Sequence, residues 1–413
     1  MLTRRAALLG GTAAVFAPLA LSADEQAALE FDPASAFPHK DAFIAIDGTY
    51  LNCASQHPIS RGGRKSILRY LDYKSLAGQS DYSVSGTYQR VLDNYATLIG
   101  ADVDEVCFVQ STTVGENLIL RAMDFPQGHG RIVTDDLHYV GSLPTYAELE
   151  NLGVEVVTLR ADEAGRVSLR QFEEAINKET RLVCVSSVSM VNGFRHDLKG
   201  LCEIAHERGA MVFADIVHEV GSMPFNVRAS GVDFCSAASY KWLMGEQGLG
   251  FLYARKDRLA GLTRPWFGHY QLKSRSSFGF PCTGMGDSIT AYEHYDGALG
   301  YFAMGSQANI NAALLDHSLH YLLAAGPDRI QKYRQPMMDR LQRALPKIGY
   351  IPITPADSKT ALVSFLHKGN VDWLHEKLST AKISISVAQH HIRVSPSVFN
   401  DMDDIERLIQ ALA

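Results

Sequence analysis

Short apolar runs alternate with amphipathic stretches between about residue 85 and residue 255. The runs have the length of strands, and the stretches between them repeat apolar residues every three to four positions, which is typical of helices. The seven runs are Glu105–Gln110, Arg131–Thr134, Glu155–Leu159, Arg181–Ser187, Met211–Asp215, Phe234–Ala237 and Gly250–Tyr253. Strands that alternate with helices build βαβ units, so the pattern predicts an α/β fold with a mostly parallel seven-stranded sheet and helices on both faces.

The remainder of the chain suggests a second, smaller domain. With 413 residues the chain exceeds one ordinary domain. We expect an N-terminal segment, residues 24–60, that packs on the active site, and a large domain over residues 61–298. A smaller α+β domain is expected over residues 299–413, beginning with the helical stretch Tyr301–Ala325.

The first 23 residues have the pattern of an export signal. Arg4 and Arg5 precede a short apolar segment that is rich in Gly and Ala and ends in small residues. A membrane anchor is the alternative, but the segment is too short for a firm span. The paired arginines resemble a twin-arginine (Tat) signal, so we predict a periplasmic protein with no stable membrane span after signal removal. Without a functional signal the protein would be cytoplasmic.

Composition narrows the classes of partner. The chain is 46% hydrophobic and 20% charged, with a net charge of −6 and no run of Lys or Arg, so we expect no nucleic-acid partner. Its six cysteines do not form a disulfide framework in so long a chain, and no Cys/His group has the spacing of metal ligands. We therefore predict no metal site.

Candidate chemistry lies at the ends of two predicted strands. The run Met211–Asp215 ends in an acid and is followed by His218, and the next run leads into Lys241. In open parallel sheets ligands bind beyond the carboxyl ends of the strands, so both side chains are expected in one crevice. Alone, Asp215 is as well explained as a helix cap and Lys241 as a solvated lysine.

Together, this acid and lysine meet the needs of pyridoxal 5′-phosphate (PLP). The cofactor requires a lysine amine that binds its aldehyde and an acid that keeps its pyridine nitrogen protonated. The glycine-rich return that follows Lys241, with Gly245, Gly248 and Gly250, strengthens this interpretation.

The segment Ser239-Tyr240-Lys241-Trp242 with its glycine-rich continuation resembles the lysine motif of class V aminotransferase-like enzymes, which have PLP fold type I. This group includes isopenicillin N epimerase-like proteins, kynureninases and cysteine desulfurases. Asp215 and His218 resemble the group's Asp-x-x-His/Gln motif. The resemblance implies that Lys241, Asp215 and His218 are catalytic, with Asp215 at the pyridine nitrogen and His218 beside the phenolic oxygen.

The same resemblance implies further contacts along most of the chain. Beyond the lysine motif, in which Ser239 and Tyr240 are also expected to contact PLP, the implied cofactor contacts are Ser111, Thr112 and Thr113 at the phosphate, Tyr139 (rather than His138) stacked on the ring, Asn192, Trp266 and Thr283. Trp266 and Thr283 resemble segments that reach a neighbouring subunit's phosphate, so a homodimer is expected. On the substrate side, Arg393 is expected to hold a carboxylate through its guanidinium, with His57 and His269 nearby.

The reaction type is less constrained than the cofactor. A desulfurase needs a nucleophilic cysteine on a mobile loop well after the lysine. The last cysteine is Cys282, and residues 283–413 contain none, so we do not expect a desulfurase. We expect an aminotransferase that acts on an amino acid or an amino-acid-derived metabolite. The alternatives are side-chain cleavage of the kynureninase or C–S lyase type, epimerisation of the isopenicillin N epimerase type, and a PLP-binding protein without catalysis. No GxGxxG pattern follows an early strand, which disfavours a nucleotide-binding α/β enzyme.

Overall fold

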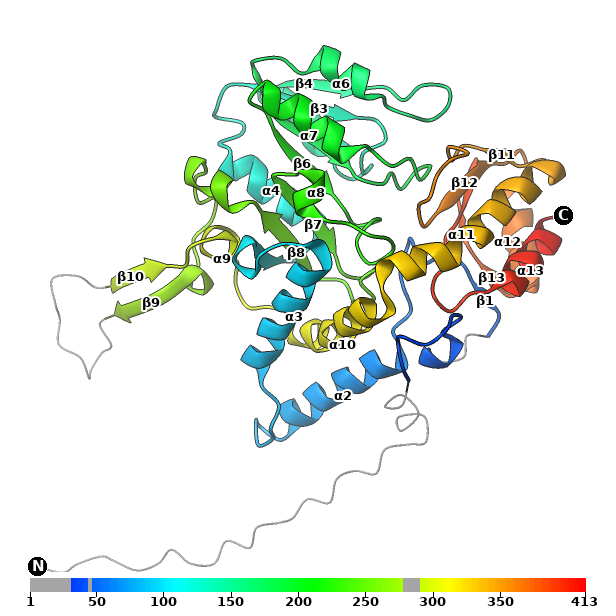
Figure 1. Cartoon of the computed structure of the whole chain (residues 1–413), viewed down its shortest axis with the longest axis horizontal. Helices are drawn as coiled ribbons and strands as arrows, with labels where there is room; N and C mark the ends of the chain where they lie inside the picture. The colour runs from blue at the N-terminus through cyan, green and yellow to red at the C-terminus, as the bar shows by residue number, and fades with distance from the viewer. Residues whose placement is uncertain (1–30, 44–46, 278–289) are drawn as a thin grey trace, which may run out of the picture.

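The computed structural model describes residues 31–43, 47–277 and 290–413, so the predicted signal (residues 1–23), Cys282 and Thr283 lie outside the described residues. A seven-stranded sheet forms the centre (Figure 1). Its strands are β2 (Val106–Val109), β3 (Arg131–Asp135), β4 (Glu155–Leu159), β5 (Thr180–Ser186), β6 (Met211–Asp215), β7 (Phe234–Ala238) and β8 (Gly250–Ala254). All seven predicted strands are therefore confirmed, within one or two residues at their ends.

The strand order in this sheet is β2-β8-β7-β6-β5-β3-β4. Strands β4, β3, β5, β6 and β7 pair in parallel, whereas β8 is antiparallel to both of its neighbours. Antiparallel β8 returns directly from the loop that carries Lys241. The predicted α/β fold with a mostly parallel sheet is confirmed.

Helices cover both faces of the sheet, as its residue pattern requires. Along β6, Val212 and Ala214 face one buried cluster and Phe213 faces the other. Cys107 and Cys184 lie in the cluster on Phe213's side, whereas Cys235 lies in the first. The helices of this region are α2 (Arg61–Ser75), α3 (Val84–Ile99), α4 (Thr112–Ala122), α5 (Leu143–Asn151), α6 (Leu169–Ala175), α7 (Leu198–Glu207), α8 (Val227–Ser230) and α9 (Ala298–Phe302).

A second sheet with its own core lies toward the C-terminus. Its four strands, in the order β11-β12-β15-β14, are β11 (Ile351–Pro352), β12 (Val363–Leu366), β15 (His391–Val394) and β14 (Ser386–Val387). Helices α11 (Pro327–Ala344), α12 (Val371–Thr380) and α13 (Met402–Leu412) share its buried cluster. Helix α10 (Asn309–Ala325), expected to begin the smaller domain, packs instead against α2 and α3. The helical stretch therefore belongs by packing with the large body.

The N-terminal segment joins the two parts of the molecule. Strand β1 (Thr49–Tyr50) pairs in parallel with β13 (Ile383–Ser384) of the smaller part. A few residues on, the backbone N–H of His57 donates to the carbonyl oxygen of Tyr240 at 3.0 Å. This segment is thus tied directly to the loop that carries Lys241.

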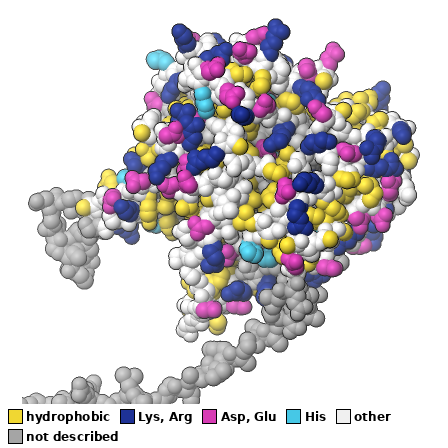
Figure 2. All heavy atoms as spheres, viewed as in Figure 1, with side chains coloured by type: hydrophobic (Ala, Val, Ile, Leu, Met, Phe, Trp, Pro, Cys, Tyr) yellow, Lys and Arg dark blue, Asp and Glu magenta, His cyan; other side chains and the backbone are white. Residues whose placement is uncertain are grey.

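A two-stranded hairpin projects from the body, at the left in Figure 1. It consists of β9 (Leu272–Ser277) and β10 (Thr290–His294), preceded by the 3₁₀ turn η4 (His269–Gln271). Phe267 is 82% exposed and Tyr292 is 60% exposed, and Figure 2 shows apolar side chains gathered where the hairpin leaves the body. The other 3₁₀ turns are η1 (Lys40–Ala42), η2 (Val103–Glu105), η3 (Lys256–Gly261) and η5 (Leu345–Ile348). Among the described residues, no helix has the length and apolar character needed to cross a bilayer.

Candidate active site

Asp215, His218 and Lys241 lie beyond the ends of neighbouring strands. Asp215 is the last residue of β6, His218 follows it in a turn, and Lys241 lies in the loop between β7 and β8. The backbone N–H of Ile216 donates to the carbonyl oxygen of Ser236 in β7 at 3.0 Å, which braces the turn against the neighbouring strand. The two predicted strand ends therefore meet, as their parallel pairing requires.

Lys241 is a buried amine with a lowered affinity for its proton. Its Nζ lies 3.2 Å from Nε2 of His218, and the residue is 7% exposed. Burial lowers the pKa of Lys241 to about 8; the negative charge of Asp215 opposes this shift, and the positive charge of Arg393 adds to it. A larger share of this amine is uncharged near neutral pH than for an ordinary lysine, which suits it to bind an aldehyde.

Asp215 is a buried carboxylate whose surroundings fit a cationic ring nitrogen. Its Oδ1 accepts a hydrogen bond from the backbone N–H of Val217 at 2.9 Å. Burial raises the pKa of Asp215, although that hydrogen bond and the nearby His138 and Lys241 lower it in part. A protonated pyridine nitrogen beside the carboxylate would add a positive charge that favours its ionised form.

Arg393 enters the same region from β15 of the smaller part. Nη1 donates to the carbonyl oxygen of Met190 at 3.0 Å and Nη2 to Oγ of Ser55 at 2.8 Å, while Nε is buried without a hydrogen-bond partner. The charge of Arg393 acts on both Lys241 and His218. Within the described part of the chain no acidic side chain pairs with this guanidinium, so it retains its capacity for a ligand carboxylate.

The predicted phosphate residues open helix α4 beside the lysine loop. Ser111 caps the helix, accepting a hydrogen bond from the N–H of Val114 at 3.2 Å. Oγ1 of Thr112 accepts from the N–H of Ala238 at 3.0 Å, and this bond ties α4 to the end of β7. Thr113 is exposed in the first turn. A helix N-terminus with hydroxyl groups is suited to a dianionic phosphate.

The two candidates for the stacking ring have different surroundings. His138 is fully buried, with Nδ1 2.9 Å from Oγ of Ser186 and Nε2 3.1 Å from Oε1 of Glu116. Tyr139 is partly exposed and acts electrostatically on Tyr240, the neighbour of Lys241. Tyr139 is the more exposed of the two rings, and it remains our prediction for the stacking residue.

Glu116 is a polar residue of this region that the sequence analysis missed. Burial raises its pKa, but hydrogen bonds and charge from His138, with hydrogen bonds from Ser142 and Tyr146, outweigh burial and lower it overall. Burial lowers the pKa of His138, and Glu116 reverses that shift and raises it. The two residues thus form a buried ion pair beneath the site. The available signal was an acid on the apolar face of the helix that follows β2.

Three residues predicted to contact a ligand form hydrogen bonds within the protein, and their ligand contacts stay predictions. Nδ2 of Asn192 donates to the carbonyl oxygen of Gly165 at 2.8 Å, and its Oδ1 accepts from the N–H of Phe194 at 2.9 Å. Ser239 donates to the carbonyl oxygen of Leu249 at 2.6 Å, within the strand return. These side chains shape the loops of the site.

His57 is the third of these residues. Its Nδ1 lies 2.8 Å from the carbonyl oxygen of Pro58 and its Nε2 lies 2.8 Å from Oγ of Ser397, so neither nitrogen is open to a substrate. Burial lowers its pKa to about 4, which keeps the ring neutral. His57 therefore supports the N-terminal segment.

Trp266 and His269 are exposed and come shortly before β9, the first strand of the projecting hairpin. Neither has a described contact with Asp215, His218 or Lys241. Thr283 lies outside the described residues. The predicted contact of Trp266 and Thr283 with the phosphate of a neighbouring subunit stays a prediction.

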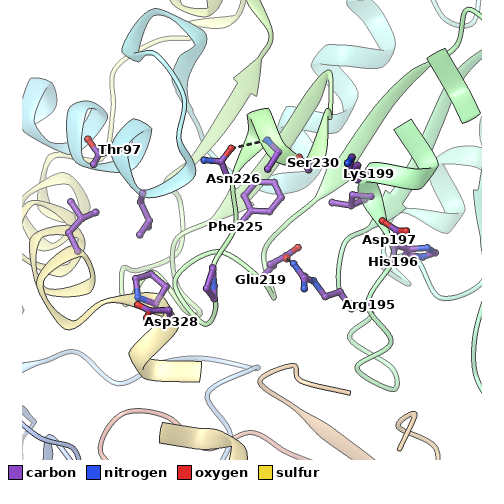
Figure 3. A pocket seen from close by; sticks show the side chains of 16 residues that line it. Thr97, Arg195, His196, Asp197, Lys199, Glu219, Phe225, Asn226, Ser230 and Asp328 are labelled. Atoms are coloured by element: carbon purple, nitrogen blue, oxygen red, sulfur yellow. Dashed lines mark hydrogen bonds and ion pairs between the residues drawn. The ribbon is translucent and has the colours of Figure 1, made fainter. Parts of the chain in front are cut away.

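A separate cavity of about 850 Å³ adjoins the turn after β6 (Figure 3). It is lined by Glu219, Arg195 and the first residues of α7 but not by Asp215 or Lys241. Nε of Arg195 donates to Oε1 of Glu219 at 2.9 Å, and the two side chains point toward each other in Figure 3. This ion pair fixes the side chain of Glu219, the residue that follows His218 in the chain.

The sequence profile of the aminotransferase class V family matches residues 68–408, a range that includes Asp215, His218, Lys241 and Arg393. The chain belongs to this family. The family is PLP-dependent, so PLP is the cofactor of this protein, and the buried lysine, the buried carboxylate at the end of β6 and the hydroxyl-bearing N-terminus of α4 fit that cofactor. Among the described residues, no group of three or more His, Cys, Asp or Glu side chains could hold a metal ion.

Curated relatives of this chain carry two kinds of name. A probable cysteine desulfurase of Methanothermobacter thermautotrophicus is 28% identical over 320 residues, which is 76% of each chain. The uncharacterized aminotransferase YcbU of Bacillus subtilis is 30% identical over 225 residues, which is 53% of this chain and 59% of that protein.

Solved structures share the fold over nearly the whole described chain. The apo cysteine desulfurase from Thermococcus onnurineus NA1 superposes with a TM-score of 0.78 at 20% identity, covering 91% of this chain and 97% of that one. The cystine C–S lyase C-DES, in complex with its product cysteine persulfide, superposes with a TM-score of 0.76 at 18% identity, covering 89% and 97%. At such identities the likeness establishes PLP fold type I, as predicted.

Proposed function

We propose that this protein is a PLP-dependent aminotransferase that acts on an α-amino acid or an amino-acid-derived metabolite. The observation that carries this proposal is that Lys241, Asp215 and His218 converge on one buried site together with an unpaired guanidinium, Arg393, from the other part of the molecule. An amine, an acid and a carboxylate-binding cation are the three functions that such a substrate and its cofactor require.

Each side chain has a distinct part in this reaction. Arg393 binds the substrate carboxylate and so places the α-carbon near Nζ of Lys241. PLP, when bound, draws electrons from the α-carbon and weakens its bonds. Lys241 takes the α-proton on Nζ and returns it to another atom, which is general acid–base work suited to an amine whose pKa is lowered to about 8. Asp215 balances the charge of the protonated pyridine nitrogen, and His218 contacts Nζ of Lys241.

Among the described residues, the surroundings of the cysteines favour none of them as the nucleophile of a desulfurase. Cys53, Cys107, Cys184, Cys202 and Cys235 are all buried. Burial raises the pKa of each of these thiols, so none is a ready nucleophile. Cys282 lies outside the described residues. The prediction against a desulfurase rested on the absence of any cysteine after it.

Cleavage of a C–S bond is the second candidate function. The cystine C–S lyase among the structural relatives and the desulfurase names of the curated relatives favour it. Elimination at the β-carbon begins with removal of the same α-proton, and it can proceed without a protein thiol when the leaving group departs by itself. The two reactions thus share Lys241 and Arg393 and differ in their products.

A homodimer and export to the periplasm complete the proposal. Trp266, Phe267 and Tyr292 are exposed at the hairpin base, around a hollow of about 680 Å³ that Phe267 and Tyr292 help to line. Large apolar side chains gathered in this way are typical of a protein interface. The proposal of export rests on the residues before position 24, which resemble a Tat signal.

Product analysis of the PLP-loaded protein with a panel of L-amino acids separates the candidates. We expect one equivalent of 2-oxo acid per active site, loss of the visible absorption of the lysine-bound cofactor, and its recovery when a different 2-oxo acid is added. Continuous release of ammonia, with pyruvate and a sulfur product from cysteine or cystine, would instead establish the lyase and overturn the aminotransferase.

A further inference from the structure

The ring of His218 lies between the indole N–H of Trp242 and the amine of Lys241. On one side, Nε1 of Trp242 lies 3.4 Å from Nδ1 of His218 and donates to it. On the other side, Nε2 of His218 lies 3.2 Å from Nζ of Lys241. An indole N–H can only donate, so Nδ1 of His218 must be the acceptor and carry no proton.

The ring of His218 is also held neutral. The residue is 2% exposed, and burial lowers the pKa of His218 well below its ordinary value, with the charge of Arg393 acting in the same direction. A neutral imidazole has one proton, and the indole excludes it from Nδ1. The proton is therefore on Nε2 and points at Nζ of Lys241.

This arrangement discriminates between the two forms of the lysine. An uncharged amine has a lone pair that accepts the Nε2–H of His218. A lysine ammonium has three donors and no acceptor, so two N–H groups would face each other across 3.2 Å. The tautomer of His218 thus favours the uncharged amine, which is the reactive form.

We propose that Trp242 is a positioning residue, which fixes the proton of His218 on Nε2 and thereby keeps the amine of Lys241 uncharged. The proposal rests on the role of Lys241 in the proposed function, but it concerns the protein's own side chains and holds for either reaction outcome. It also gives a role to the tryptophan that follows the lysine, which the sequence analysis left without one.

Several contacts keep the indole in place. The guanidinium of Arg334, a fully buried residue of α11, lies 5.5 Å from the centre of the Trp242 ring, and its Nη2 donates to the carbonyl oxygen of Ser222 at 2.9 Å. On the N-terminal side the ring of His57 packs edge-on at 6.5 Å. Gly221 has a φ of +83°, and a Cβ there would lie 2.5 Å from the carbonyl oxygen of Trp242. Contacts from α11 and from the N-terminal segment therefore hold the ring that sets the tautomer.

Other charged and titratable groups around Lys241 act on its charge but do not contact Nδ1 of His218. Asp215 at the end of β6 favours the ammonium, and Arg393 on β15 disfavours it. The ring of Tyr240 lies 5.6 Å from Nζ. His138 acts on Asp215, and Tyr139 acts on Tyr240. Among the described side chains, the indole of Trp242 is the one that donates to Nδ1.

Nitrogen-15 NMR of the histidine rings tests the tautomer directly in the wild-type protein. The His218 signals are assigned by their loss in His218→Gln, and spectra are recorded with and without PLP. We expect Nδ1 to have the shift of an unprotonated nitrogen and Nε2 that of a protonated one. A protonated Nδ1 in the wild-type protein would overturn the proposal without recourse to any variant.

The rate of covalent PLP capture as a function of pH tests the consequence for Lys241. Trp242→Phe keeps an aromatic ring but removes the indole N–H. The proton of His218 can then move to Nδ1, which leaves Nε2 free to accept from the ammonium of Lys241. We expect the midpoint of the pH profile to rise by about one unit, which is about a tenfold smaller uncharged fraction at a given pH below it. Trp373→Phe, at a residue 48% exposed on α12, is the matched control and should leave the profile unchanged.

A double-mutant cycle separates this role from a merely structural one. A glutamine at position 218 can donate to Lys241 without help from an indole. In the His218→Gln background, Trp242→Phe should therefore shift the profile no further. An equal shift in both backgrounds, or no shift in either, would overturn the proposal. Failure of the aminotransferase proposal would appear in the reaction products and leave these measurements unaffected.

Discussion

The strand-end cluster around Lys241 and the hairpin base around Phe267 were both predicted to serve the cofactor, yet their surroundings are opposite. In the cluster, Asp215, His218 and Lys241 are each at most 7% exposed, and each is held by hydrogen bonds or charges from its own chain. At the hairpin, Phe267 is 82% exposed and Tyr292 is 60% exposed. The first site is assembled by the fold of one chain, whereas the second presents a surface that one chain leaves uncovered.

The largest expected effect is at the lysine. Lys241→Ala should lower turnover by about 10⁴-fold or more, because it removes both the covalent anchor and the acid–base group. Steady-state kinetics of the PLP-loaded protein measures this loss. Lys332→Ala, at an exposed lysine on α11, is the control and should behave as wild type. Comparable turnover in the two variants would remove Lys241 from the mechanism.

Asp215→Asn should have the next largest effect. The amide keeps the shape but cannot balance a pyridinium charge, so we expect turnover to fall on the order of 10²–10³-fold. The visible spectrum of the bound cofactor should change with it. Asp357→Asn, at an exposed carboxylate on the surface, provides the control. Unchanged turnover would mean that another group protonates the ring nitrogen.

Lys241 should also lower the stability of the cofactor-free protein in a pH-dependent way. The folded pKa of about 8 lies below the ordinary lysine value of 10.5, so the unfolded chain binds more protons between these pH values. Lys241→Met should therefore be more stable than wild type by about 3 kcal/mol below pH 8, and the difference should shrink as pH rises toward 10.5. Chemical denaturation at several pH values measures it. A difference independent of pH would show that the lysine is not perturbed.

Arg393→Gln should weaken binding of substrates that carry a carboxylate. Loss of a charge-assisted hydrogen bond costs about 1.5–3 kcal/mol, so KM should rise by about 10- to 100-fold. The corresponding amide substrates give the control, because they should lose little. If KM rose equally for both substrate classes, Arg393 would not bind the carboxylate. Its role would then be structural, through its hydrogen bonds to Met190 and Ser55.

The smallest of these effects is expected at the hairpin. A charge in an apolar interface should weaken association, so Phe267→Asp should raise the dimer dissociation constant by about tenfold or more. Analytical ultracentrifugation measures this change, with Leu152→Asp as the control at another exposed apolar side chain, 63% exposed. A monomeric wild-type protein with full PLP occupancy would remove the distinction between the two regions.

The sequence was informative where chemistry follows from strand ends. The seven apolar runs predicted the sheet, and parallel pairing brought Asp215 and Lys241 to the same edge. It was less informative where the hydrogen bonds of a side chain depend on how loops fold and meet. Asn192, Ser239 and His57 are engaged with nearby groups, and such bonds depend on loop geometry that no residue pattern encodes.

Two residues with consequences for the site were missed for a related reason. Glu116 and Trp242 act through contacts with His138 and His218, which come from other elements of the fold. On the sequence each is an ordinary residue of its segment. Their significance appears only when the rings that they contact are placed beside them.

Borohydride reduction of the PLP-loaded protein, followed by peptide mapping, tests the central assignment most directly. Reduction fixes the cofactor permanently to the lysine that holds it, and mass spectrometry then identifies the modified residue. We predict that the label is found on Lys241, the buried amine at the end of β7. A label on any other lysine, or none on Lys241 after full loading, would contradict this assignment.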